Sequence, residues 1–101
     1  MIISNADVYI GKNTTLAYRT IITTNANPNA PYNQLCKIYP PLYEEVRIGD
    51  NVWIGVGAII LPGCVIGDNC VVSAGSVVVN DIPNNVMVAD VPAKIKKEIV
   101  F

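Results

Sequence analysis

The chain has 101 residues, of which 51% are hydrophobic and 15% are charged. This length suits one small domain, and the apolar content exceeds what one small core needs, so we expect partner subunits to cover part of it. Seven Lys and Arg against eight Asp and Glu leave a net charge of -1, with no basic run that could follow a phosphate backbone. We therefore expect no nucleic-acid partner.

Membrane and export signals are not expected either. Pro62, Gly63, Asp68 and Asn69 interrupt the most apolar region, which stays below the roughly 20 residues of a membrane span. The N-terminal segment contains no basic residue ahead of an apolar run, so it does not follow the plan of a signal peptide. These features predict a cytoplasmic protein with no membrane partner.

The cysteines indicate neither a metal site nor disulfides. Cys36, Cys64 and Cys70 are an odd number, and their spacing fits neither a CxxC metal site nor a disulfide framework. Cys64 and Cys70 are expected to be small buried apolar residues, whereas Cys36 lies in a predicted loop. No metal site is expected.

A six-residue period starts near the N-terminus and returns after an interruption. Its first aliphatic residues are Ile10, Leu16 and Ile22, and the period resumes with Ile48, Ile54, Ile60, Ile66, Val72 and Val78. Small or apolar residues follow the second series four positions later: Val52, Ala58, Cys64, Cys70, Ser76 and Ile82. We expect both sets to face inward.

Turn-forming residues stand between these inward positions. Three positions after each aliphatic residue come Asn51, Gly57, Gly63, Asn69, Gly75 and Asp81, which tolerate left-handed backbone or tight turns. A corner in every hexapeptide does not fit an α-helix, whose period is about 3.6. It predicts an all-β prism with three short parallel strands in each coil.

A loop is predicted between the two series. The interval from Ile22 to Ile48 is not a multiple of six, and we interpret it as three hexapeptides plus eight further residues. An outward loop at about 25–45, where Asn, Pro and Tyr crowd together, accounts for the excess. About four coils follow, at 4–21, 22–47 with the loop, 48–65 and 66–83, so that 1–83 forms the β-helix.

The predicted cap is 84–101, where the six-residue register ends. Val91, Ile95 and Ile99 recur at every fourth position, beside the charged residues Lys94, Lys96, Lys97 and Glu98. The spacing favours a short amphipathic helix or an extended tail that closes the open end of the prism.

The stretch IGDNVWIGVGAIILPGCVIGDNCVVSAGSVVVNDIPNNVMVADVPAKIKKEI, Ile48 to Ile99, resembles the hexapeptide-repeat sugar O-acetyltransferases, such as those acting on maltose, galactosides, capsule and lipopolysaccharide. The resemblance implies a left-handed coil, a homotrimer, acetyl-CoA as co-substrate in the groove between neighbouring prisms, and a carbohydrate acceptor. Typical members are longer, with an N-terminal helical segment and a further coil that contact the acceptor.

The resemblance also locates the catalytic position. The family's base is a histidine on the protruding loop, at a fixed spacing after the isoleucine that matches Ile10. Counted along this chain, that position is Asn27, followed by Pro28, and the sequence has no histidine at all. Asn27 also fits a turn-forming loop residue or an acceptor contact, and these interpretations stay open. Because an amide cannot accept a proton near neutral pH, turnover is expected to be slow or absent. Glu44 or Glu45, at the end of the loop, is the alternative base.

The cofactor positions follow in the same way. The resemblance places acetyl-CoA against Val56, Ala74, Val79, Asn80, Lys94 and Lys97, with both lysines near its phosphates. Two features depart from the family: Val79 and Asn80 replace Thr-Lys, and Asp90 replaces the glycine of AGxPA, which adds a carboxylate. The alternative interpretation is that the valines and alanines only fill coils and that the lysines are solvated.

Three other functions share parts of this pattern. A trimeric pseudoenzyme that binds without turnover stays open. An ice-binding prism requires a threonine ladder, but Thr14, Thr15, Thr20, Thr23 and Thr24 do not recur in the later coils. The γ-class carbonic anhydrases share the expected fold, yet they bind their metal through histidines, which this chain lacks.

Overall fold

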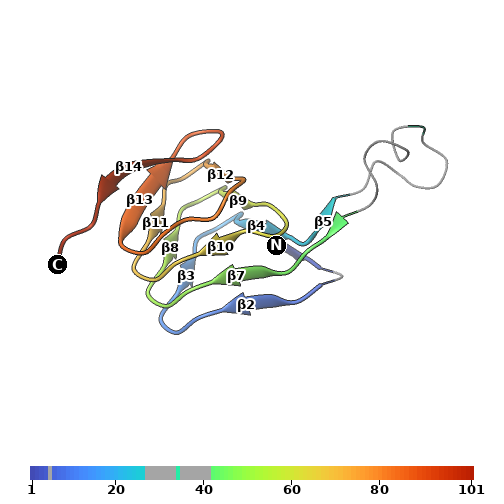
Figure 1. The fold of residues 1–101 in the computed structure, drawn as a ribbon, viewed down its shortest axis with the longest axis horizontal. Coiled ribbons are helices and arrows are strands. Elements are labelled where there is room, and N and C mark those ends of the chain that lie inside the picture. The colour runs from blue at the N-terminus through green and yellow to red at the C-terminus, as the bar shows by residue number, and fades with distance from the viewer. Residues whose placement is uncertain (5, 27–33, 35–41) are drawn as a thin grey trace.

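The computed structural model describes residues 1–4, 6–26, 34 and 42–101, which wind into a three-sided prism of short strands (Figure 1). The strands of the prism are β1 (Ile2–Ile3), β2 (Val8–Ile10), β3 (Thr15–Leu16), β4 (Ile21–Thr23), β7 (Val46–Ile48), β8 (Trp53–Ile54), β9 (Ile59–Ile60), β10 (Val65–Ile66), β11 (Val71–Val72), β12 (Val77–Val78), β13 (Val86–Ala89) and β14 (Lys94–Glu98). No α-helix occurs among the described residues.

Each side of the prism is one sheet. Face A has the order β1-β4-β9-β12, face B has β2-β7-β10, and face C has β3-β8-β11-β13-β14. Neighbouring strands pair in parallel on all three faces, except that β14 runs antiparallel to β13. The chain therefore visits the three faces in turn, as the six-residue period predicts.

The predicted corners have the expected backbone, with one exception. Asn51, Gly57, Gly63, Asn69 and Gly75 all have positive φ, between 55° and 79°. Asp81 is not among the residues with positive φ; its carboxylate instead accepts a hydrogen bond from the Val65 amide at 2.9 Å. This corner therefore differs from the other five, and it is followed by a shorter coil, in which Val71 pairs with Met87.

Side chains join successive coils at the corner between faces B and C. The Asp50 carboxylate accepts a hydrogen bond from the Lys12 amide at 2.7 Å, and the Asp68 carboxylate accepts one from the Asp50 amide at 2.8 Å. Asn84 continues the series by accepting from the Asp68 amide at 2.7 Å. Each coil thus satisfies a backbone donor of its neighbour at a turn that strand pairing does not reach.

The core is the column of inward residues that the period predicts. All the predicted inward residues from Ile48 to Ile82, including Cys64 and Cys70, are buried. Ile22 is also buried, whereas Ile10 and Leu16 are 41% and 36% exposed. Those two belong to β2 and β3, the outermost strands of their faces, so no further strand covers them in the described part of the chain.

The predicted length of the insertion is wrong. A regular coil consists of three hexapeptides, as between the paired residues Ile48 and Ile66. Across the insertion, Ile10 pairs with Ile48 on face B and Ile22 pairs with Ile60 on face A, and both intervals exceed two regular coils. The insertion is therefore slightly longer than one full coil, rather than eight residues long. The stretch from Ile22 to Ile48 leads only from face A to the neighbouring face B, so it does not form a coil of its own.

The loop expected at about 25–45 lies mostly outside the described residues and stays a prediction, whereas the two segments that flank it are described. β5 (Asn25–Ala26) and β6 (Leu42–Tyr43) pair antiparallel at its base, outside the three faces, where the chain leaves the prism (Figure 1). The Thr24 carbonyl accepts the Glu44 amide at 3.0 Å and extends this base.

The C-terminal residues form a strand, so the helix considered for 84–101 is wrong and the extended alternative holds. β13 pairs with β11 through Met87 and Val71, and parallel pairing thus continues beyond residue 83 after a coil that is two residues shorter than the regular ones. β14 then returns along β13. The edge of β13 offers backbone partners along its length, whereas an isolated helix this short is unstable.

Candidate functional site: an apolar groove below β14

An apolar groove lies on face C at the corner that leads to face A. Its volume is about 430 Å³, and its lining comprises Ala17, Trp53, Gly55, Val56, Val71, Val72, Ser73, Ala74 and Met87. Two predicted cofactor residues, Val56 and Ala74, are brought together in this lining although a full coil separates them in the sequence. Trp53 is 59% exposed and forms part of the wall.

The backbone at this corner is tightly packed yet leaves donors free. The Gly75 amide donates to the Val56 carbonyl at 2.9 Å. A Cβ on Gly55 would lie 2.5 Å from the Ala74 nitrogen, so only glycine permits this approach of the two coils. Within the described part of the chain, the amides of Val56 and Ala74 donate no hydrogen bond. They are therefore available to a ligand lying in the groove.

Val79 and Asn80 do not line the groove. Both are exposed, and they follow directly after β12 on face A. Their contact with a cofactor therefore stays a prediction.

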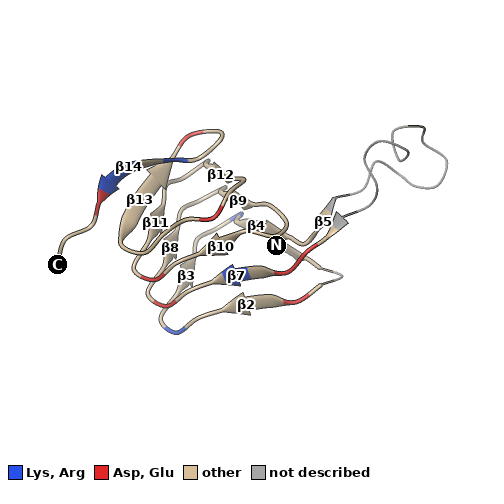
Figure 2. Cartoon of the chain, viewed as in Figure 1, with Lys and Arg blue, Asp and Glu red and all other residues tan. Residues whose placement is uncertain are grey.

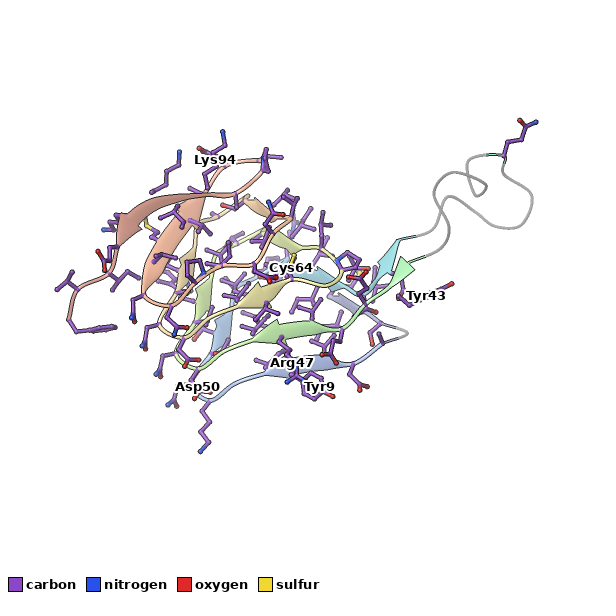
Figure 3. The ribbon with its side chains drawn as sticks, viewed as in Figure 1. Tyr9, Tyr43, Arg47, Asp50, Cys64 and Lys94 are labelled. Carbon is purple, nitrogen blue, oxygen red and sulfur yellow. The ribbon has the colours of Figure 1, made fainter. Side chains whose placement is uncertain are left out.

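Lys94 and Lys97 lie on β14, the outermost strand of face C. Lys97 pairs with Met87, a residue of the groove lining, and Lys94 pairs with Ala89. Both lysines are exposed. Figure 2 shows the positive charge gathered on this strand, and Figure 3 shows Lys94 projecting from the C-terminal end of the prism. The structure thus places Lys97 opposite a residue of the groove lining, with Lys94 on the same edge strand.

Asp90 occupies a backbone conformation that suits glycine. Its φ is 87°, which explains why a glycine fits at this position of the family motif. The carboxylate forms an ion pair with Lys96 at 2.5 Å, so its negative charge is matched locally. The turn packs back on β12, because the Val77 amide donates to the Asp90 carbonyl at 3.2 Å and the Ala93 amide donates to the Val77 carbonyl at 2.8 Å.

The structure describes both alternative bases, Glu44 and Glu45, but not the predicted catalytic position. Asn27 lies outside the described residues. Glu45 accepts a hydrogen bond from Arg47 Nε at 3.0 Å, and this bond raises the pKa of the guanidinium. The Glu44 carboxylate lies against Gly63, where it would overlap an added Cβ. Among the described residues, Glu45 is therefore the alternative base that has a cationic partner.

A second hollow, on face B, was not foreseen from the sequence. It has a volume of about 610 Å³ and lies around Tyr9, Arg47 and Val65, which pair across β2, β7 and β10. The Arg47 guanidinium lies 4.1 Å from the Tyr9 ring centroid, and the Tyr9 hydroxyl donates to Asp7 at 3.1 Å, which raises the tyrosine pKa (Figure 3). Only the true length of the insertion would have revealed that Tyr9 and Arg47 are neighbours.

Two other kinds of site do not occur in the described ranges. These residues contain no group of His, Cys, Asp or Glu able to hold a metal ion. The same part of the chain has no helix of the length and apolarity needed to cross a membrane.

Comparison with known proteins identifies the class of fold. Residues 45–80 match the family described as "Bacterial transferase hexapeptide (six repeats)". The predicted left-handed parallel β-helix of hexapeptide repeats is confirmed by this match together with the structural neighbours below.

Individual relatives make the resemblance more specific. The chain is 39% identical over 98 residues to galactoside O-acetyltransferase of Escherichia coli strain K12, covering 97% of this chain and 47% of the relative. The structure of a maltose O-acetyltransferase from Clostridium difficile 630 is 41% identical with a TM-score of 0.81, over 93% of this chain and 49% of that one. A galactoside acetyltransferase in complex with coenzyme A is 37% identical with a TM-score of 0.86, over 98% and 48%.

These matches confirm the predicted resemblance to the hexapeptide-repeat O-acetyltransferases, and the chain carries the hexapeptide repeat of the bacterial transferases. The chain spans about half the length of the curated relatives it matches.

Proposed function

We propose that the chain binds acetyl-CoA and takes part in acetyl transfer to a carbohydrate hydroxyl, with slow or absent turnover in its present sequence. The observation that carries this proposal is the apolar groove. Val56 and Ala74 line it with amides that donate no hydrogen bond within the described part of the chain, and its residue Met87 pairs with Lys97 of β14. An apolar slot with a few backbone donors suits the pantetheine arm, and the exposed cations suit phosphates. The relative whose structure contains coenzyme A supports the same assignment.

The slow rate follows from the residue at the catalytic position. Attack by a hydroxyl on the thioester needs a base to accept the hydroxyl proton and donors to stabilise the oxyanion. Asn27 has no proton affinity near neutral pH, and the chain has no histidine that could replace it. Without turnover, the groove makes the chain a trimeric binding scaffold, which is the second function that the missing imidazole favours.

A homotrimer is part of the same proposal. Val56 and Val65 are 51% and 41% exposed, and Val71 and Val77 are only partly buried on the outer surfaces of faces C and A. Packing of three prisms side by side would cover such flanks and close the groove. Sedimentation of a monomer at micromolar concentration would contradict this part. The cytoplasmic location stays a prediction.

The test is to place an imidazole at position 27. We expect Asn27→His to release CoA thiol from acetyl-CoA and a sugar panel about 10² to 10⁴ times faster than the unmodified chain. Asn27→Ala is the matched control and should stay at the basal rate. Calorimetry with CoA measures cofactor binding independently of turnover.

Two outcomes would contradict the proposal in different ways. If CoA binds but Asn27→His gains no activity, the limit is either the acceptor-binding part of the longer relatives or a different base. Glu44→Gln with Glu45→Gln then becomes the next comparison. If CoA does not bind, the cofactor assignment fails unless Asp90→Gly with Asn80→Lys restores binding.

A further inference from the structure

Strand β14 contains a β-bulge at Lys96. Its pairing with β13 runs through Lys97 opposite Met87 and then Ile95 opposite Val88, with the register shift between Met87 and Val88. Two steps along β14 therefore correspond to one step along β13, and Lys96 has no partner in the ladder. Bulges of this kind redirect side chains and frequently lie beside functional sites.

The bulge changes the face on which the lysines lie. Residues three apart in a regular strand point to opposite faces, so Lys94 and Lys97 would normally diverge. Directly opposed residues in an antiparallel pair share a face. Lys97 therefore lies on the face of Met87 and Lys94 on the face of Ala89, and these two residues of β13 are two apart, on one face.

The alternation of burial along β13 identifies that face. Val86 and Val88 are buried in the core, whereas Met87 and Ala89 are partly exposed on the other side. Met87 lines the apolar groove. Both lysines thus lie on the outer, groove-lining face of the sheet.

Lys96 is held outside the ladder by an ion pair. Its ammonium lies 2.5 Å from the Asp90 carboxylate, at the turn that enters β14. Two backbone hydrogen bonds fix this turn against Val77 of β12. Asp90 is thereby fixed beside β12, where its carboxylate anchors the ammonium of the bulged residue.

We propose that the β-bulge at Lys96, held by Asp90, turns Lys94 and Lys97 together toward the groove, where they bind the phosphates of a CoA-type ligand. Lys96 and Asp90 are positioning residues in this arrangement and do not contact the ligand. The inference rests on the proposed binding of CoA and adds the origin of its phosphate selectivity.

The experiment compares the affinities of two probes, CoA and pantetheine, by calorimetry. Their ratio isolates the phosphate contribution, because both probes carry the pantetheine arm. We expect Lys94→Ala and Lys97→Ala each to lower the CoA-to-pantetheine ratio about tenfold, since each removes one cation from the phosphates.

The decisive pair of variants is Lys96→Gln and deletion of Lys96. Both remove the same charge and leave Asp90 without its partner. Deletion leaves Lys94 and Lys97 two apart in a regular strand and hence on one face, whereas Lys96→Gln keeps the extra residue without its anchor. We expect Lys96→Gln to lower the ratio about fivefold to tenfold and the deletion to stay within about threefold of the unmodified chain.

Several results would overturn the inference. Equal losses in Lys96→Gln and in the deletion would show that charge alone matters. An unchanged ratio in Lys97→Ala beside a lowered one in Lys94→Ala would place the lysines on opposite faces. If the deletion does not fold, as judged by circular dichroism and thermal unfolding, the two alanine variants decide. An unmodified chain that binds neither probe overturns this inference, and it overturns the proposed function as well if Asp90→Gly with Asn80→Lys does not restore binding.

Discussion

The middle of the prism and its C-terminal end differ in regularity. From Val46 to Val78, paired residues of neighbouring strands are three hexapeptides apart on every face. The inward side chains stack in unbroken columns. From Ile82 onward the coil is two residues shorter, one strand runs antiparallel, and a bulge enters the ladder. The difference teaches that strict repetition builds the core, whereas the departures from it add an exposed, charged edge strand, β14.

The largest expected effect contrasts the regular middle with the first coil. Ile54→Ala should lower the free energy of unfolding by about 2–5 kcal/mol, because Ile54 is fully buried and leaves a cavity. Ile10→Ala shortens an inward residue of β2, an outermost strand, and should cost about 1 kcal/mol or less, since Ile10 is 41% exposed. Urea denaturation measures both, and equal losses would contradict the comparison.

The second effect tests two glycines at the groove corner. Gly55→Ala should destabilise the fold by about 1–3 kcal/mol, because the new methyl group would overlap the Ala74 backbone. It should also weaken CoA binding by shifting the groove wall. Gly57→Ala is the control: a Cβ there meets no atom within 4 Å, and only the positive φ of 71° opposes it, at about 1 kcal/mol. Thermal unfolding and calorimetry separate the two.

A third test compares two hydroxyls in one inward column. Ser76 Oγ is buried and has no hydrogen-bond partner among the described residues, so Ser76→Ala should stabilise the protein by about 1 kcal/mol. Thr20 Oγ1 donates to the Ala17 carbonyl at 2.7 Å, and Thr20→Val should therefore destabilise it by about 1 kcal/mol. Changes of the same sign in urea denaturation would contradict this account.

The smallest effect concerns the two buried thiols of the regular middle. Burial raises the pKa of Cys64 and of Cys70 above the ordinary 9.0. The unfolded chain then loses its thiol protons first as pH rises, so stability is complete well below pH 9 and falls as the pH passes upward through that value. Between pH 7 and 9 the two thiols should therefore account for a small loss of stability, measured as the pH dependence of the free energy of unfolding. Cys64→Ala combined with Cys70→Ala should remove this slope.

The sequence by itself determined the regular part of the molecule. Every predicted inward residue from Ile48 to Ile82 is buried, and Asn51, Gly57, Gly63, Asn69 and Gly75 adopt the expected left-handed backbone. This success has a physical reason: each hexapeptide contains its own inward residue and its own corner, so the pattern is local. The same register brought Val56 and Ala74 to one groove.

Tertiary structure alone decided the length of the insertion. The separation of Ile22 and Ile48 admits more than one division between coil and loop, and only the pairing of Ile10 with Ile48 selects an insertion longer than a coil. The face-B neighbours Tyr9 and Arg47 follow from the same pairing. Local sequence patterns do not contain this information, because it depends on which strands pair with each other in successive coils.

Tertiary structure also determined the secondary structure of the C-terminal residues. The recurrence of Val91, Ile95 and Ile99 at every fourth position fits a helix, yet the exposed edge of β13 supplies backbone partners that make a strand more stable. The bulge at Lys96 then reverses the face of Lys97, which strand alternation read from the sequence would have assigned to the side opposite Lys94. Side-chain direction in an edge strand depends on the pairing register, and that register exists only once the prism has formed.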